Sequence, residues 1–354
     1  MQNKIGNDEK YYNEQDKLNT IRMREVLDTL PHFCRQFFRG IETTTSARTR
    51  LGYAYDLRTF FEYLHSKNPA LKNMAITEYK LDILDMIERE DIEEYQEYLS
   101  LYEKKDKEIT NAEQGKKRKM SALRCLYTYF YKAELIQRNT AELVKMPKLH
   151  ENEIIRLEPD EVATLLDQVE AGDKLTKGQL KYHEKTKLRD VALLTLLLGT
   201  GIRVSECVGI DIDDIDFKTN GIRIHRKGGY NTTVYFPDEV RTALINYLED
   251  RKLKIPEEGS ENALFLSMQN KRITVRAVEN LVKKYSRNVT TLKKITPHKL
   301  RSTFGTNLYK ESGDIYLVAD VLGHKDVNTT RKHYAAQDDE NRRRAANMVK
   351  LREK

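Results

Sequence analysis

Apolar residues recur every three or four positions over much of the chain, which is the spacing of amphipathic α-helices. The clearest apolar stripe covers residues 44–68, and similar stripes predict helices over residues 91–99 and 115–135. Residues 1–40 are polar and then amphipathic, so we expect a frayed start and one helix there. A polar segment, residues 103–114, separates two of these helices. The first part of the chain therefore predicts a small bundle made only of helices.

A different pattern begins after a stretch that has proline and charge but no periodicity. Residues 146–153 form this stretch, which is typical of a linker;. Pro159 and the carboxylates beside it then favour a helix start. Residues 188–198 are almost uniformly apolar and predict a buried helix. The lysine-rich residues 171–187 before them form either a surface loop or an exposed extension of that helix.

The period changes once more, from helical spacing to alternation. Residues 221–225 and 232–236 alternate and are rich in β-branched side chains, and Gly228 and Gly229 between them can adopt positive φ. This pattern predicts a β-hairpin. Further helices are expected over residues 238–253, 274–287, 296–310 and 314–322. The charged segment after residue 334 forms either a docked helix or a frayed tail.

The length fits more than one domain, because 354 residues can build two good cores;. We expect an N-terminal extension (residues 1–40), an α-bundle (41–148), a linker (149–156) and a second domain (157–354). The longest apolar run, residues 191–198, is too short to cross a bilayer, and the charged amino terminus lacks a signal-peptide core. A soluble, cytoplasmic protein without membrane contact is expected.

Charge and cysteine content narrow the class of protein. The net charge is +7, from 62 Lys and Arg against 55 Asp and Glu. The basic residues cluster at residues 116–119, 223–227, 293–294 and 342–344. Distributed basic patches suit a protein that surrounds a polyanion, so nucleic acid is the expected partner. The three cysteines are widely spaced and argue against a disulfide framework or a zinc site;.

Candidate chemistry gathers near the carboxyl end. Thr296 and Pro297 predict a helix start, which would place His298 and Arg301 on one face beside the positive end of the helix. Such a helix start can hold a phosphate. A second imidazole, His324, follows a glycine that would end a helix, and the phenol of Tyr334 comes ten residues later. Upstream, the chain adds Arg203 and, one turn on, Glu206.

These separated motifs together resemble the tyrosine recombinase (integrase) family. Residues 188–206 resemble the first arginine box of that family, and residues 296–308 and 322–334 resemble the second box, in the same order;. Residues 49–60 resemble, more loosely, the first helix of the core-binding domain of Xer-type recombinases. The resemblance implies a mainly α (α+β) protein. A SAM-like all-α core-binding bundle would precede a mainly α catalytic domain with a small antiparallel sheet or hairpin.

The resemblance also assigns roles. Two arginines, Arg203 and Arg301, would grip the non-bridging phosphate oxygens with forked donors. The phenol of Tyr334 would be the nucleophile, and Lys227 in the hairpin would protonate the leaving 5′ oxygen. Assistance in acid–base chemistry would come from His298. The remaining imidazole, of His324, would hydrogen-bond a non-bridging oxygen, and Glu206 would hold an arginine or histidine in place.

The helix over residues 115–135 carries basic residues on one side. This side is either a solvated face or, as the resemblance favours, a surface that contacts phosphates through Lys116, Lys117, Arg118, Lys119 and Arg124.

Two positions depart from the family pattern. The family typically has glycine before the lysine of the hairpin, where Arg226 stands here. Many members place the nucleophile nine residues after the histidine of the Leu-Gly-His motif, a position held here by His333. Some members end in the same Lys-His-Tyr arrangement. Tyr309 and Tyr316 are the alternative nucleophiles, although both fall inside predicted amphipathic helices.

The expected function is site-specific recombination of duplex DNA at an inverted-repeat site. A homotetramer on two sites would exchange strands through a Holliday junction, with no cofactor and no metal. An Xer-like role in chromosome-dimer resolution is favoured, with a paralogue or accessory protein as a possible partner and the nucleoid as the place of action. Alternatives with the same chemistry are a mobile-element integrase or excisionase and a topoisomerase-like enzyme. From another class, the alternative is a DNA-binding regulator that does not cut.

Overall fold

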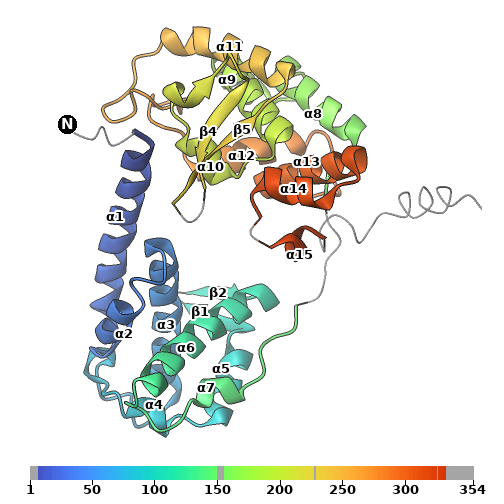
Figure 1. Cartoon of the computed structure of the whole chain (residues 1–354). Helices are drawn as coiled ribbons and strands as arrows, with labels where there is room; N and C mark the ends of the chain where they lie inside the picture. Colours follow the sequence, from blue (N-terminus) through green and yellow to red (C-terminus); the bar gives the residue numbers. More distant parts are fainter. Residues whose placement is uncertain (1–6, 105, 150–154, 227–228, 325, 332–354) are drawn as a thin grey trace, which may run out of the picture. The chain divides into compact units, whose positions relative to one another are not determined.

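The computed structural model describes residues 7–104, 106–149, 155–226, 229–324 and 326–331 (Figure 1). Contacts divide the chain into two compact units. The N-terminal unit comprises residues 10–152, and the C-terminal unit comprises residues 153–354 together with the first nine residues. The boundary falls within the linker expected at residues 149–156, most of which lies outside the described residues.

The N-terminal unit is a bundle of helices around one core. Its helices are α1 (Asn7–Leu27), α2 (Cys34–Gly40), α3 (Ala47–Lys67), the 3-10 helix η1 (Ile76–Glu78), α4 (Ile83–Met86), α5 (Arg89–Tyr98), α6 (Glu113–Lys132) and α7 (Thr140–Leu143). Aromatic rings meet edge to face in the core: the ring of Phe33 lies 5.9 Å from that of Phe61 and 5.6 Å from that of Phe130. This geometry is the favoured one for aromatic pairs.

The single helix expected within residues 1–40 is wrong, because two helices, α1 and α2, form there. Pro31 stands between them and has no backbone N–H to continue a helix;. Both helices bury apolar side chains in the same core as α3 and α6, among them Val26 of α1 and Phe37 of α2. Residues 10–40 therefore pack as part of the bundle.

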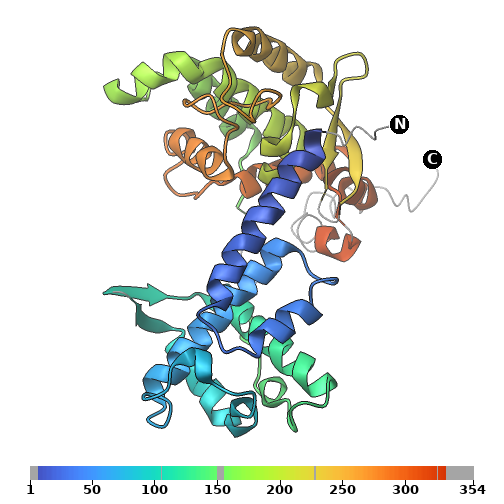
Figure 2. The ribbon, with the colours of Figure 1, turned by 90° about the vertical axis from the view of Figure 1, so that its left-hand side faces the viewer.

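A short β-hairpin interrupts the bundle where only a polar segment was expected. Strands β1 (Leu101–Lys104) and β2 (Lys107–Thr110) pair antiparallel, with Leu101 opposite Thr110. The hairpin projects from the helices (Figure 2). Tyr102 is its anchor, since its ring is buried and stacks on that of Tyr98 at 5.0 Å.

The C-terminal unit is built around one long helix. Its elements are α8 (Pro159–Ala171), α9 (Lys177–Thr200), α10 (Val204–Gly209), η2 (Ile212–Asp214), β3 (Ile215–Asp216), β4 (Gly221–His225), β5 (Asn231–Tyr235), α11 (Asp238–Lys252), α12 (Val275–Ser286), α13 (Pro297–Ser312), α14 (Ile315–Leu322) and α15 (Val327–Thr330). The apolar end of α9 is buried among α8, α11 and α13. A helix that is apolar on all sides needs this kind of cover. The lysine-rich segment before it belongs partly to α9 as an exposed extension.

The predicted hairpin is present as β4 and β5, with His225 opposite Asn231. Strand β3 adds to its edge and gives a three-stranded antiparallel sheet of order β3–β4–β5. Among the described residues, then, the protein is mainly α with two small antiparallel sheets. None of the described helices has both the length and the apolar character of a membrane span.

Candidate active site

The first part of the candidate site is the turn between α9 and α10. Gly201 ends α9 in the left-handed region, with φ of +61°, and a Cβ there would lie 2.3 Å from the ring of Phe304 on α13. Only glycine fits a turn that needs both positive φ and this close approach. The turn delivers Arg203 to the N-cap of α10.

Arg203 is held in place by Glu206, one turn later on α10. One carboxylate oxygen of Glu206 accepts a hydrogen bond from the Arg203 backbone N–H at 2.7 Å, and the other accepts one from Nη1 of the same residue, also at 2.7 Å. Glu206 is buried, whereas the side chain of Arg203 remains 32% exposed. The carboxylate therefore fixes the guanidinium while leaving part of it open to solvent.

Arg301 joins the two sequence motifs. It lies near the start of α13, which begins at Pro297 after the N-cap residue Thr296. Its side chain is buried and its guanidinium is hydrogen-bonded. Nη1 donates to the carbonyl of Gly201 at 2.6 Å, and Nη2 donates to the carbonyl of Leu322 at the end of α14. His298 lies exposed on the same first turn of α13.

The end of α14 brings in the second imidazole. Gly323 adopts φ of +64° and ends the helix, and the backbone N–H of His324 donates to the carbonyl of Ala319 at 2.9 Å. Nδ1 of His324 lies 2.7 Å from the hydroxyl oxygen of the buried Thr330. An Nη2–H of Arg203 reaches the carbonyl of Gly323 at 3.4 Å.

The structure therefore brings several predicted site residues to one place. Arg203, Glu206 and Arg301 meet at the Leu322–Gly323 turn that leads into His324. The predicted general acid Lys227 and the predicted nucleophile Tyr334 lie outside the described residues. Of the two alternative nucleophiles, Tyr316 on α14 is exposed and Tyr309 on α13 is partly buried.

One contributor to this cluster escaped the sequence analysis. Arg226, which was noted as part of a basic cluster and as a departure from the family pattern, is buried and donates to the carbonyls of Leu322 and Val321. One feature of the sequence could have indicated this role: Arg226 stands where the family typically has glycine before the lysine of the hairpin.

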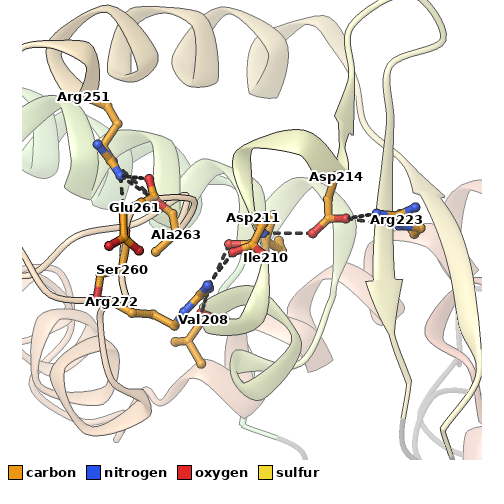
Figure 3. Close-up of polar contacts among 10 residues, drawn as sticks. All are labelled: Val208, Ile210, Asp211, Asp214, Arg223, Arg251, Ser260, Glu261, Ala263 and Arg272. Atoms are coloured by element: carbon orange, nitrogen blue, oxygen red, sulfur yellow. Dashed lines mark hydrogen bonds and ion pairs between the residues drawn. The ribbon is translucent and has the colours of Figure 1, made fainter. Parts of the chain in front are cut away.

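A second polar network supports the loop that follows α10 (Figure 3). Arg272 donates to the carbonyls of Val208 and Ile210 and pairs with Asp211. The backbone N–H of Asp211 donates to Asp214, whose other carboxylate oxygen accepts from Arg223 on β4 at 2.8 Å. This chain of contacts ties the end of α10 to the strand that leads into the hairpin.

The basic residues predicted to bind DNA on α6 have partners within the N-terminal unit. Arg118 and Lys119 both pair with Asp56 on α3, which is buried. Burial raises the pKa of the Asp56 carboxyl and lowers the pKa of Lys119, while each charge opposes the shift of the other. Arg124 donates to the backbone carbonyls of Ala141, Glu142 and Val144, which stabilises the end of α7.

Lys116 and Lys117 complete the predicted surface. Nζ of Lys116 donates to the hydroxyl of Ser100 at 2.7 Å, and both lysines are partly exposed. Phosphate contact by all five basic residues of α6 stays a prediction. Arg124 has in addition a structural task that its sequence position did not indicate.

Comparison with known proteins identifies the family. The model of the phage integrase family matches residues 156–341, which is more than half of the chain. The protein belongs to the phage integrase family. The predicted family is thereby confirmed, and the matched range contains every residue of the candidate site.

Relatives of this integrase-family protein carry tyrosine recombinase names. Tyrosine recombinase XerC of Caldanaerobacter subterraneus is 33% identical over 94% of this chain and 92% of its own length. Tyrosine recombinase XerS of Streptococcus agalactiae is 29% identical over 90% of this chain and 96% of its own.

Solved structures share the fold. A post-cleavage complex of the XerH site-specific recombinase has a TM-score of 0.64 at 21% identity, over 86% of this chain and 80% of that chain. The Tn1549 transposon integrase bound to circular intermediate DNA also has a TM-score of 0.64, at 20% identity over 90% of this chain and 99% of that chain. The predicted mainly α fold is thus confirmed.

Proposed function

We propose that this protein is a site-specific DNA recombinase that cuts and rejoins DNA through a covalent 3′-phosphotyrosyl intermediate. The observation that carries this proposal is the meeting of Arg203 and Arg301 at the turn that leads into His324. These three residues come from separate elements, α10, α13 and the end of α14, so the fold itself assembles them. Membership of a family whose relatives are named tyrosine recombinases supports the same reading.

The chemistry starts with the charge on the scissile phosphate. Arg203 and Arg301 would hold its non-bridging oxygens and neutralise the charge that grows in the transition state. His324 would add a hydrogen bond to one of these oxygens, and its contact with Thr330 sets the direction of the ring. Glu206 acts through Arg203, because it fixes the guanidinium from both its backbone and its side chain.

Bond making and breaking would fall to the remaining residues. The phenolic oxygen of Tyr334 would attack phosphorus, giving up its proton with assistance from His298, while the 5′ oxygen leaves and takes a proton from Lys227. The phosphotyrosyl bond retains the free energy of the broken phosphodiester, so rejoining requires no nucleotide. Two guanidinium groups can supply the positive charge that a divalent metal provides in other phosphoryl-transfer enzymes.

The role we favour is Xer-like resolution of chromosome dimers in the cytoplasm, at the nucleoid. The XerC and XerS relatives match this chain over nine-tenths or more of its length, which supports it. The expected substrate is a duplex with inverted half-sites, on which four copies act in two rounds of strand exchange. A paralogue or accessory protein would fit the same scheme. Integration or excision of a mobile element would use the same site.

A trapping experiment tests the function. Genomic fragments bound by the protein would first be selected and sequenced to give its site, and a nick would then be placed beside the cleavage position. Loss of the short fragment prevents rejoining, so the wild type should accumulate a detergent-stable adduct with DNA, and Tyr334→Phe should form none. An adduct in Tyr334→Phe would refute this nucleophile. If the wild type forms no adduct on its selected site, the protein is a non-cutting DNA binder. The genomic position of the site separates chromosome resolution from element mobility.

A further inference from the structure

Among the described residues of the hairpin, Arg226 is the most deeply buried charge. It directly follows β4, and its backbone closes the hairpin loop: its N–H donates to the carbonyl of Tyr230 at 2.9 Å, and its carbonyl accepts from Gly229 at 3.1 Å. Only 3% of the residue is exposed. A charge is rarely buried to this degree unless it has firm partners.

Those partners lie on another element. Nη1 donates to the carbonyl of Leu322 at 2.6 Å and Nη2 to the carbonyl of Val321 at 2.9 Å, both at the carboxyl end of α14. The last carbonyls of a helix have no partner within the helix, and they form the negative end of its dipole. Arg226 therefore stabilises the same helix end that Arg301 and Arg203 also contact.

Arg226 also shares a counterion with the clamp. Its Nη1 lies 3.8 Å from a carboxylate oxygen of Glu206, and the same oxygen accepts from Arg203 at 2.7 Å. Burial lowers the pKa of Arg226 and the charge of Arg203 lowers it further, while Glu206 raises it. The two guanidinium groups are thus coupled through one buried carboxylate.

Gly323 shows how close the contact is. A Cβ on this residue would lie 2.6 Å from Cζ of Arg226, so the guanidinium lies directly against the glycine backbone. Positive φ alone favours glycine here, and the arginine removes the space for any side chain;. The turn that leads into His324 is consequently packed against the hairpin.

We propose that Arg226 is a positioning residue that sets the Arg203 guanidinium and the Leu322–Gly323 turn in register for phosphate binding. It acts through Arg203 and the turn, without contacting the substrate. This inference rests on the proposed function, because the register matters only if a phosphate is bound there. It extends that function by giving a task to the residue that departs from the family pattern.

The main test measures the rate of the covalent step. The probe is the nicked duplex carrying the site selected by the protein itself, and the readout is single-turnover adduct formation at saturating protein. Arg226→Met should slow the step by about tenfold to a hundredfold, the usual effect of a displacement of about 1 Å at a reacting group. Affinity for the duplex should stay as in the wild type. Arg226→Lys keeps the charge and should recover part of the rate.

Arg251 offers a matched control. It is also buried and donates to backbone carbonyls, those of Ser260, Glu261 and Ala263, and burial lowers its pKa as well (Figure 3). Arg251→Met should therefore lose stability without losing the rate per folded molecule. Thermal unfolding of each variant gives the folded fraction. Equal rate losses in Arg226→Met and Arg251→Met would reduce Arg226 to a purely structural role and overturn the proposal.

Modified phosphates locate the defect. A methylphosphonate at the scissile position has one charged oxygen fewer and needs the guanidinium clamp less, so the defect of Arg226→Met should shrink on it. A 5′-bridging sulfur leaves without needing a proton, so it should not rescue the variant. If the 5′-bridging sulfur restores the rate of Arg226→Met and the methylphosphonate does not, Arg226 supports protonation of the leaving group, and the assignment is refuted.

A stability measurement tests the contact without any DNA. Gly323→Ala should destabilise the wild type more than it destabilises Arg226→Ala, because the guanidinium that the new methyl group meets is then gone. Equal effects in the two backgrounds would contradict the packing. If the wild type forms no adduct, the proposed function fails and this inference fails with it. An active wild type with fully active Arg226 variants overturns the inference alone.

Discussion

Replacement of Asp190 should cost more stability than replacement of any exposed ion-pair partner, because Asp190 is the centre of a buried network. It lies on α9 and is 1% exposed. Its carboxylate accepts from the guanidinium of Arg189 at 2.6 Å, from the hydroxyl of Tyr285 on α12 at 2.9 Å and from that of Thr186 at 3.1 Å. Nζ of Lys284 lies 3.6 Å away.

The expected magnitude follows from burial. In Asp190→Ala, the buried Arg189 charge and the Tyr285 hydroxyl lose this partner together, and breaking a buried pair in this way costs about 3–5 kcal/mol. Glu249 provides the control, since its ion pair with Lys252 has the same 2.6 Å N–O distance but side chains that are 67% and 68% exposed. Glu249→Ala should cost about 1 kcal/mol or less.

The assay is urea unfolding of the full chain followed by circular dichroism, with the change in unfolding free energy taken from the shift of the midpoint. Hydrogen exchange read by mass spectrometry assigns the shifted transition to residues 153–354. Each unit can unfold separately, so this assignment is necessary. An Asp190→Ala variant within about 1 kcal/mol of Glu249→Ala would refute the argument that burial sets the worth of this pair.

Three further outcomes are expected. Gly201→Ala should lower the free energy of unfolding by about 2–4 kcal/mol, because the strain of positive φ and the overlap of the new methyl group with Phe304 add together;. Chemical denaturation measures this loss. Burial raises the pKa of Asp56 above 3.8, so the folded state binds this proton more tightly than the unfolded state, and the associated stability is lost as pH rises through the folded pKa;. The stability of Asp56→Asn relative to the wild type should accordingly increase as pH rises through the folded pKa of Asp56, and a difference independent of pH would contradict this;. Lys117→Ala should make the plot of the logarithm of the DNA-binding constant against the logarithm of salt concentration less steep, by about the amount of one phosphate contact. An unchanged slope would show that Lys117 does not contact the DNA.

The helices were predictable where the apolar stripe is long. The apolar stripe over residues 44–68 predicted α3 to within a few residues, and the start signals Thr296 and Pro297 predicted where α13 begins;. Strands β1 and β3 were not predictable. Their four and two residues are too few to show alternation, and pairing across a turn decides them instead;.

Local spacing also predicted part of the candidate site. Glu206 stands one turn after Arg203, so their contact could be expected from the sequence alone. The contact between Arg226 and Leu322 spans 96 residues, and no periodicity carries such information. The structural role of Arg124 could not be predicted for the same reason. The carbonyls that accept its hydrogen bonds belong to another part of the chain, at α7.

The anchoring of Arg203, Arg226 and Arg301 to one helix end separates two effects of ionic strength. Mobile salt ions screen charges that face water and reach buried groups poorly. Of these three side chains, those of Arg226 and Arg301 are buried. The electrostatic potential that these two charges create at the turn is therefore set by the folded structure and depends little on the salt concentration. Concentrated salt should therefore release the protein from DNA long before it slows the reaction of molecules that are still bound.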